Sequence, residues 1–368
     1  MGTVLELLLV AESPAEARAV ADEVFALVED LEAELSSWRP RSAVARLNAS
    51  AGQGLRRVPP PVHRALREAL RATTLTRGAF DPTVGPLVEL WRQAAERNRL
   101  PEPTALEAAR ERVGPDRVHL SDDGRVALAP GSRLDLGGLA KGFALDRVDA
   151  LLHERDVQAA LVSFGQSSLL VRGHPPDARG FRILLRGVGH APAGVLTVNG
   201  HAHLSVSESL GQWREVAGRR LGHVIDPRSG WPLEHAALAA VLAPSGTLAE
   251  ALSKALLVLP GDEGLALLET LPEVEGRYVR EDGGVRETSG FGEAASFVPW
   301  PEQNPSGQPP PPTGQRSPGP WPAGARARAP AAREAGLRAS PPRGSRVRSS
   351  GEERAPTGAS RRARSASG

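Results

Sequence analysis

Apolar residues recur at three- and four-residue spacing along several stretches of the chain, which predicts amphipathic helices. The clearest stretch is Ser13–Trp38, whose apolar positions are Val20, Val24, Leu27, Leu31 and Leu35. The other predicted helices are Val62–Leu75, a segment that starts at Asp81 and runs through Trp91 to Ala95, Gly138–His153, Leu248–Leu259 and Glu263–Leu271.

Alternating or short apolar runs predict strands between these helices. They are Thr3–Val10, Arg133–Leu136, Val157–Arg172, Phe181–Arg186, Val195–Val198, His203–Ser207 and Ala237–Leu242, with a last pair near Tyr278 and Val285. Two hairpins are expected, one within Val118–Ala127 and one joining Trp213–Val216 to Arg219–Ile225. The combination predicts an α+β fold, with mixed, mostly antiparallel sheets and packed helices.

The pattern stops near Val298, where the composition changes to proline, arginine, serine and glycine. Residues 298–368 are therefore expected to form a disordered tail. The tail carries a net charge of +8 and the remainder of the chain −6, so the high pI belongs to the tail. A basic tail could contact nucleic acid or anionic lipid. A solvated extension is the simpler interpretation, and no nucleic-acid partner is expected for the folded part.

The composition excludes cysteine-based sites and gives no indication of a transmembrane helix or a signal peptide. The chain has no cysteine, which excludes disulfides and thiolate chemistry. No apolar run approaches the roughly 20 residues of a transmembrane helix. Met1–Val10 lacks a positive n-region and reads as a strand rather than a signal peptide. As written, the chain is expected to be cytoplasmic.

The chain has only two lysines, and one of them, Lys141, lies in the segment LDLGGLAKGFALDR at Leu134–Arg147. A glycine pair followed by a helix N-terminus and a lysine could cradle a phosphate. The spacing of a Walker A loop is absent, and no GxGxxG occurs. Taken alone, such a glycine turn is more often a packing feature.

A second candidate segment is GHVIDPRSGWP at Gly222–Pro232. His223 could act as a general base, and Asp226 could orient it or bind a ligand hydroxyl. A histidine beside a turn is as often structural.

The other lysine, Lys254, lies in AEALSK at Ala249–Lys254, four residues after Glu250 on one helix face. An ordinary i,i+4 ion pair is the interpretation that this spacing favours. The functional alternative is a carboxylate ligand for a hard cation such as Mg²⁺.

Together and in this order, these segments resemble the ApbE family, the FAD:protein FMN transferases. The resemblance covers about Met1–Glu293, so the T-fold-like transferase domain is expected at residues 1–293. Its motifs are Met1–Thr3, Leu35–Asn48 (LSSWRPRSAVARLN), Gly78–Trp91 (GAFDPTVGPLVELW), Leu134–Arg147, HVIDPRSGWP and AEALSKALLVL.

The resemblance implies Mg²⁺-dependent transfer of FMN from FAD to a threonine hydroxyl of an acceptor flavoprotein, with release of AMP. It implies His223 as base or orienter, supported by Asp226, and Ala140, Glu250 and Lys254 at the metal position. The implied FAD contacts are Met1, Trp38, Ala79, Phe80, Asp81, Gly138 and Lys141, with the pyrophosphate near Gly137 and Gly138.

Four residues depart from the family pattern. Glu250 stands where the family has aspartate and Lys254 where it has threonine, while Gln166 and Glu208 replace glycines. An ammonium group cannot ligate a metal. One hypothesis is that Lys254 supplies the positive charge in place of Mg²⁺; the other is a degenerate paralogue that binds flavin without transferring it.

In relatives the MGT motif lies inside the chain, behind an export signal or a lipid anchor, whereas this sequence begins with it. If the start was placed at an internal methionine, the protein is expected to be exported or membrane-anchored instead.

Overall fold

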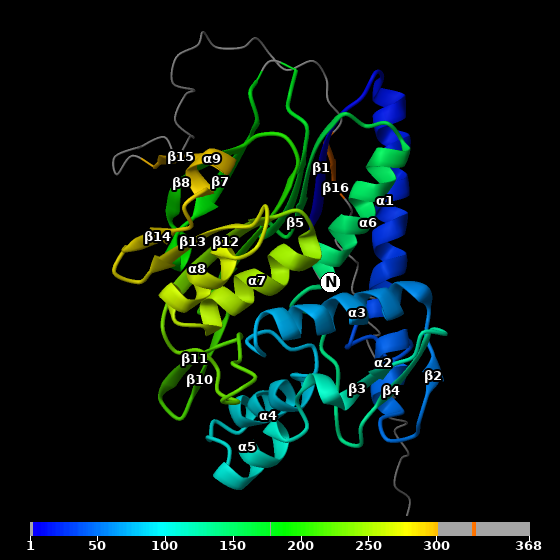
Figure 1. Cartoon of the computed structure of the whole chain (residues 1–368), viewed down its shortest axis with the longest axis vertical. Helices are drawn as coiled ribbons and strands as arrows, with labels where there is room; N and C mark the ends of the chain where they lie inside the picture. Colours follow the sequence, from blue (N-terminus) through cyan, green and yellow to red (C-terminus); the bar gives the residue numbers. More distant parts are fainter. Residues whose placement is uncertain (1–2, 177, 301–325, 329–368) are drawn as a thin grey trace, which may run out of the picture. The chain divides into compact units, whose positions relative to one another are not determined.

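The computed structural model describes residues 3–176, 178–300 and 326–328 (Figure 1). The predicted FAD contact Met1 and most of the predicted tail lie outside the described residues. None of the described helices is long and apolar enough to cross a membrane.

The helices follow the predicted periodicity, and α1 shows how the local sequence starts one. Ser13 accepts a hydrogen bond from the Glu16 amide, and Pro14 follows at the first helical position. The α-helices are α1 (Pro14–Leu35), α2 (Ala43–Ala49), α3 (Pro60–Leu75), α4 (Gly85–Glu96), α5 (Pro103–Arg110), α6 (Ala140–Glu154), α7 (Gly246–Val258), α8 (Gly261–Glu269) and α9 (Phe291–Ala294); Pro115–Arg117 and Val188–His190 are short 3₁₀ turns.

The main sheet has eight strands in the order β14-β13-β12-β9-β6-β5-β1-β16, and every neighbouring pair is antiparallel. Its strands are β1 (Leu5–Val10), β5 (Ala159–Phe164), β6 (Ser168–Arg172), β9 (Ala202–Glu208), β12 (Ala237–Ala243), β13 (Glu275–Arg280), β14 (Val285–Glu287) and β16 (Arg326–Arg328). The α+β class and the antiparallel pairing are therefore confirmed.

Three smaller sheets complete the fold: β7 (Phe181–Arg186) with β8 (Pro192–Val198) and β15 (Ala295–Pro299), β10 (Trp213–Val216) with β11 (Arg219–Gly222), and β2 (Arg56–Arg57) with β4 (Arg125–Leu128) and β3 (Val118–Leu120). Both predicted hairpins are confirmed as β3–β4 and β10–β11.

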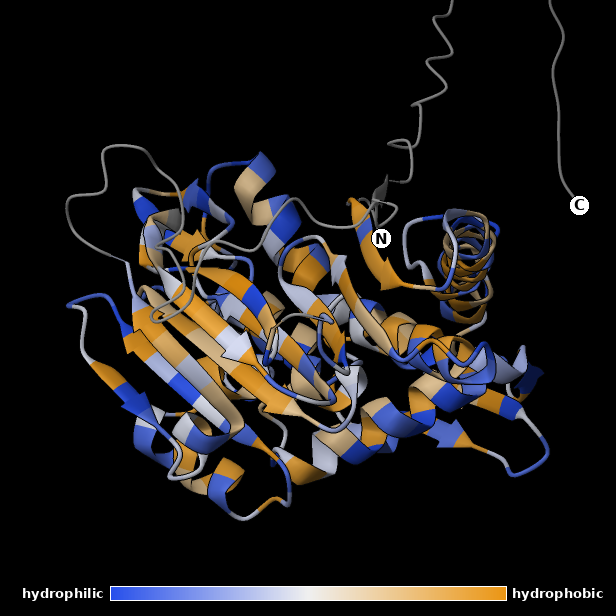
Figure 2. Ribbon diagram, turned by 90° about the horizontal axis from the view of Figure 1, so that it is seen from above, coloured by the Kyte–Doolittle hydropathy of each residue, from blue (hydrophilic) through white to orange (hydrophobic). Residues whose placement is uncertain are grey.

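The main sheet is buried on both faces, which explains the uninterrupted apolar run of β12. Ala237, Ala239 and Val241 pack with α7 and α8, whereas Leu238 and Leu242 pack with the β7–β8–β15 sheet. Near β1 and β5 the helical face is covered by α1, α3 and α6. Figure 2 shows hydrophobic residues running along the strands of this sheet.

Two predictions near the glycine pair need correction. Arg133–Leu136 is not a strand, and only Arg133 forms an isolated bridge, with Val84. The reason is that the neighbouring backbone groups bond elsewhere: Leu134 exchanges two hydrogen bonds with the Asn48 side chain, and the Asp135 amide donates to Pro82. The helix begins at Ala140, two residues later than expected, because 137–139 form a turn.

The predicted strand Val157–Arg172 is two strands joined by a hairpin, β5 and β6. The turn between them contains Gly165 at φ +67° and Gln166 at φ +60°. Gln166 thus adopts the left-handed backbone that usually favours glycine. The turn therefore accommodates a glutamine at this position.

Candidate functional site

The candidate site is a cavity of about 1170 Å³. Segments far apart in sequence line it, including the start of α6, the β5–β6 turn, β7, the end of β9 and α7. Eleven residues singled out from the sequence meet on its walls: Trp38, Ala79, Phe80, Asp81, Gly137, Gly138, Lys141, Gln166, Glu208, His223 and Lys254.

The loop after α3 presents Ala79, Phe80 and Asp81 to the cavity. The Phe80 amide donates to Thr76 Oγ1 at 3.1 Å, which fixes the loop to the end of the helix. Asp81 accepts hydrogen bonds from the Thr83 amide at 2.7 Å and from its hydroxyl at 2.5 Å. Burial raises the pKa of Asp81 above its ordinary value, and the bonds from Thr83 oppose that shift.

The glycine turn approaches this loop closely. A Cβ atom at Gly138 would lie 3.2 Å from the Phe80 ring, so glycine lets the backbone reach the cavity wall. The Gly137 amide donates to Asp135 Oδ1 at 2.8 Å, which folds the turn. This hydrogen bond and the close approach to Phe80 hold the backbone that leads into α6.

Lys141, in the first turn of α6, points its amine toward the cavity. Its Nζ donates to Ser167 Oγ at 2.5 Å and lies 3.5 Å from Glu250 Oε1. Burial lowers the pKa of Lys141 to about 8. An anion in the cavity would favour the charged form of this amine.

Glu250 and Lys254, on α7, form the i,i+4 ion pair that the spacing favoured. The Glu250 side chain is 1% exposed and lies behind the cavity wall, whereas Lys254 lines the cavity. Glu250 also accepts a hydrogen bond from Ser168. Burial lowers the pKa of Lys254 and the charge of Lys141 adds to that effect, while the adjacent Glu250 carboxylate favours the charged amine.

His223 has one defined ring contact: its Nδ1 lies 3.1 Å from the Gln212 carbonyl oxygen. Because a carbonyl only accepts, Nδ1 carries the proton and Nε2 keeps its lone pair. Desolvation in the cavity lowers the pKa of His223; the bond to Gln212 opposes this, and the charges of Lys254 and Lys141 contribute to it. The ring is therefore neutral near pH 7 and able to accept a proton.

Asp226 lies in the turn after His223 and does not line the cavity. Its carboxylate accepts bonds from the Arg228 amide at 2.9 Å and from the Arg228 side chain at 3.0 Å. The Asp226 amide donates to Trp231 O, and the Gly230 amide donates to Asp226 O. Asp226 therefore shapes the loop rather than touching the imidazole ring.

Sequence reasoning did not identify Arg182 and Arg186 of β7, which also line the cavity. They alternate with Phe181, Ile183 and Leu185, which are buried in the core. The period-two pattern of the strand was the available signal, because it placed both arginines on the face opposite the core. Gln212 lines the cavity as well.

Trp38 forms part of the cavity rim and is 67% exposed, the largest exposed fraction among the large hydrophobic residues described. An exposed indole beside a cavity is a surface on which a planar ring system can stack. The backbone amide of Trp38 donates to Ser36 Oγ at the end of α1, and this hydrogen bond holds the backbone of Trp38 in place.

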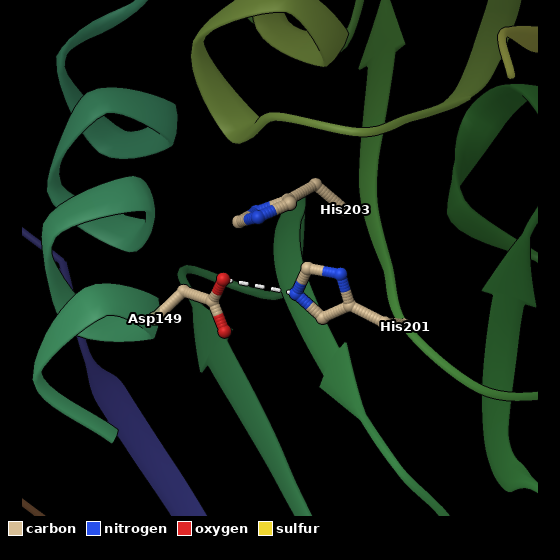
Figure 3. Close-up of side chains that lie close together, drawn as sticks. All are labelled: Asp149, His201 and His203. Carbon is tan, nitrogen blue, oxygen red and sulfur yellow. Dashed lines mark hydrogen bonds and ion pairs between the residues drawn. The ribbon is translucent and has the colours of Figure 1, made fainter. Parts of the chain in front are cut away.

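A separate cluster joins α6 to the start of β9 (Figure 3). Asp149, His201 and His203 each offer one ligand atom, and these atoms lie within 4.8 Å of one another. Asp149 Oδ2 accepts from His201 Nε2 at 2.9 Å, while its other oxygen accepts from Arg172 at 3.0 Å. The donor set suits zinc, but the guanidinium already neutralises the carboxylate.

The comparisons with known proteins agree on one group. A family model described as the ApbE family matches residues 1–277. The chain is 32% identical to an FAD:protein FMN transferase of Treponema pallidum, across 79% of this chain and 85% of that protein.

Two solved structures are similar to this one. The flavinyl transferase ApbE of Pseudomonas stutzeri, in its apo form, shows 28% identity and a TM-score of 0.68, covering 79% of this chain and 92% of that one. The ApbE protein of Thermotoga maritima shows 25% identity and a TM-score of 0.72, covering 80% and 96%.

Proposed function

Since the chain belongs to the ApbE family, we propose that it is an FAD:protein FMN transferase that moves FMN from FAD to a threonine hydroxyl of an acceptor protein. The observation that carries the proposal is the convergence of Lys141, His223 and Lys254 on one cavity. These groups provide positive charge and a proton acceptor, which are what phosphoryl transfer requires of a protein.

FAD is the donor in this proposal, and the cavity walls offer a surface for each of its parts. Trp38 and the loop through Ala79, Phe80 and Asp81 receive a ring system. Gly138 and Lys141 receive the pyrophosphate, because the glycine turn admits the phosphates to within reach of backbone and amine.

The reaction breaks one bond and forms one. The threonine Oγ attacks the phosphorus on the FMN side of the pyrophosphate, and the bond from that phosphorus to the bridging oxygen breaks. AMP leaves, a threonine phosphoester of FMN forms, and His223 Nε2 accepts the hydroxyl proton. Asp226 supports this step by holding the loop that presents the ring.

The family implies Mg²⁺ at the position formed by Ala140, Glu250 and Lys254, but these residues do not fit a cation. Lys254 has no lone pair to offer when charged. Glu250, the one carboxylate, already pairs with Lys254, lies 3.5 Å from Lys141 and accepts from Ser168. No step of the reaction is therefore assigned to a metal.

The test is to mix the protein with FAD and an acceptor protein that the T. pallidum relative labels in the same assay. Intact mass then shows whether the acceptor has gained one FMN less water. Labelling supports the transferase. FAD binding without labelling, while the T. pallidum enzyme labels, would instead support the flavin-binding alternative.

A further inference from the structure

The side chains of Lys254, Glu250 and Lys141 form a charge cluster in which two amines share one carboxylate. Lys254 Nζ bonds to Glu250 Oε2, and Lys141 Nζ lies 3.5 Å from Glu250 Oε1. The lysine side chains are 19% and 22% exposed, whereas that of Glu250 is 1% exposed. The positive groups face the cavity and the negative group lies behind them.

Two ammonium groups and one carboxylate give the cluster a net charge of +1, so an excess of positive charge is available to a pyrophosphate. With Mg²⁺ in place of Lys254, the sum of Lys141, the carboxylate and the cation would be +2. A lysine binds phosphate as a point charge without the ligand geometry that Mg²⁺ demands.

The packing around Glu250 holds its side chain beside the two lysines. Gly142 of α6 faces Glu250, and a Cβ atom there would lie 2.7 Å from Glu250 Cγ. The α6–α7 contact is therefore tight at this point, and Ser168 donates to the Glu250 carboxylate from β6. The described partners of the carboxylate are a hydroxyl donor, Ser168, and two amines, Lys141 and Lys254, so its buried charge is compensated.

We propose that the Lys254 ammonium, anchored by Glu250, takes the place of the divalent cation against the pyrophosphate of the donor, so that this chain binds and cleaves FAD without a metal. The proposal rests on the proposed function for the transfer step, and on FAD binding alone for the charge role.

The test measures FAD affinity and acceptor labelling with excess chelator and with Mg²⁺. We expect FAD affinity and labelling rate in chelator to equal those in Mg²⁺ within about twofold. Lys254→Met, of similar length but uncharged, should weaken FAD binding in chelator about 10-fold and slow labelling by about 10²-fold, the order seen when one electrostatic contact to developing charge is lost. Lys254→Arg should retain much of both.

Arg92→Met is the matched control. Arg92 also forms an i,i+4 pair on a helix, with Glu96, but it does not line the cavity. FAD binding and labelling should be unchanged in this variant. The double change Glu250→Asp with Lys254→Thr should make labelling dependent on Mg²⁺, because it restores the aspartate and the threonine of the family pattern.

The outcomes separate the two proposals. Labelling that requires Mg²⁺ in the unaltered protein would overturn the lysine role and leave the transferase intact. Absence of labelling where the T. pallidum enzyme succeeds would overturn the transferase, and the FAD titration then decides the lysine role. FAD affinity in chelator that Lys254→Met leaves unaltered would refute that role outright.

Discussion

At the scale of single residues, function depends on which partner each polar atom finds. His223 donates from Nδ1 to the Gln212 carbonyl, 11 positions earlier in the chain, and this leaves Nε2 as acceptor. Asp226, three positions later, instead holds Arg228. The spacing of histidine and aspartate suggested that the two side chains pair with each other. In the structure each binds a different partner.

Replacing His223 by alanine should slow acceptor labelling by about 10²–10⁴-fold, because the hydroxyl proton then has no positioned acceptor. FAD affinity should change by less than about threefold, since the ring's Nε2 serves the acceptor rather than the donor. In the unaltered protein, the loss of rate on the acid side should lie below pH 6.5, because the pKa of His223 is lowered from that value. An equal loss of FAD binding would contradict the base role.

The two histidines near Asp149 should respond to acid in opposite ways. Burial lowers the pKa of His203, so the unfolded state takes up its proton first and stability falls as the pH drops below 6.5. The bond to Asp149 raises the pKa of His201, so this group stabilises the fold below 6.5 and loses that effect as the pH rises through its folded value.

Denaturation midpoints measured between about pH 7 and pH 5 would check this. His203→Gln should flatten the loss of stability toward acid, and His201→Gln should steepen it. The same slope in both variants would show that neither histidine controls the acid response.

At the scale of elements, the crossing of α6 and α7 brings the two lysines together. Gly142 and Gly246 lie at this crossing, and a Cβ on either would meet the backbone of the other helix. Asp146 of α6 caps α7 by accepting from the Gly246 amide at 2.5 Å and from the Thr247 amide at 3.0 Å. The close approach and the cap together fix the position of α7 along α6, and this places Glu250 beside Lys141.

Gly142→Ala should destabilise the fold by about 1–3 kcal/mol, because the methyl group forces the helices apart. It should also weaken FAD binding by displacing Lys141 from Glu250. Gly292→Ala is the control, since a Cβ there meets nothing within 4 Å. Urea unfolding compares the two, and equal midpoints would argue against a tight crossing.

At the scale of the whole molecule, the main sheet is covered by helices on one face and by the β7–β8–β15 sheet on the other. β7 contributes Arg182 and Arg186 to the cavity from its outer side. The last described strand of that small sheet, β15, pairs with β8 from Ala295 to Pro299, so the segment beyond Glu293 supports a wall of the site.

A chain ending at Trp300 should therefore keep its FAD affinity. A chain ending at Glu293 should have a lower Tm. Losing β15 removes the buried Ala295 and the partly buried Phe297 from the core. The cost is about 3 kcal/mol, or roughly 5 °C in a domain of about 300 residues. Calorimetry of both truncations decides the matter, and coincident transitions would mean that β15 is dispensable.

The sequence by itself determined the features that repeat locally. Helical periodicity predicted α1, α3 and α7, while alternation predicted β7 and β9 and a short apolar run predicted β12. Turn residues predicted both hairpins, and ordered motifs indicated the family and several of the cavity residues. Such patterns are readable because each depends on neighbours within a few positions, where backbone geometry is fixed.

Only the tertiary structure decided which distant groups touch. The bond from Ser168 to Glu250 spans 82 positions, and the approach of Lys141 to Glu250 depends on how two helices cross. The pattern of Arg133–Leu136 predicted a strand, but the backbone of Leu134 forms its hydrogen bonds with the Asn48 side chain instead of with a neighbouring strand. These contacts depend on which elements pack against each other. The periodic pattern of a segment shows which face is buried, but not which distant segment covers it.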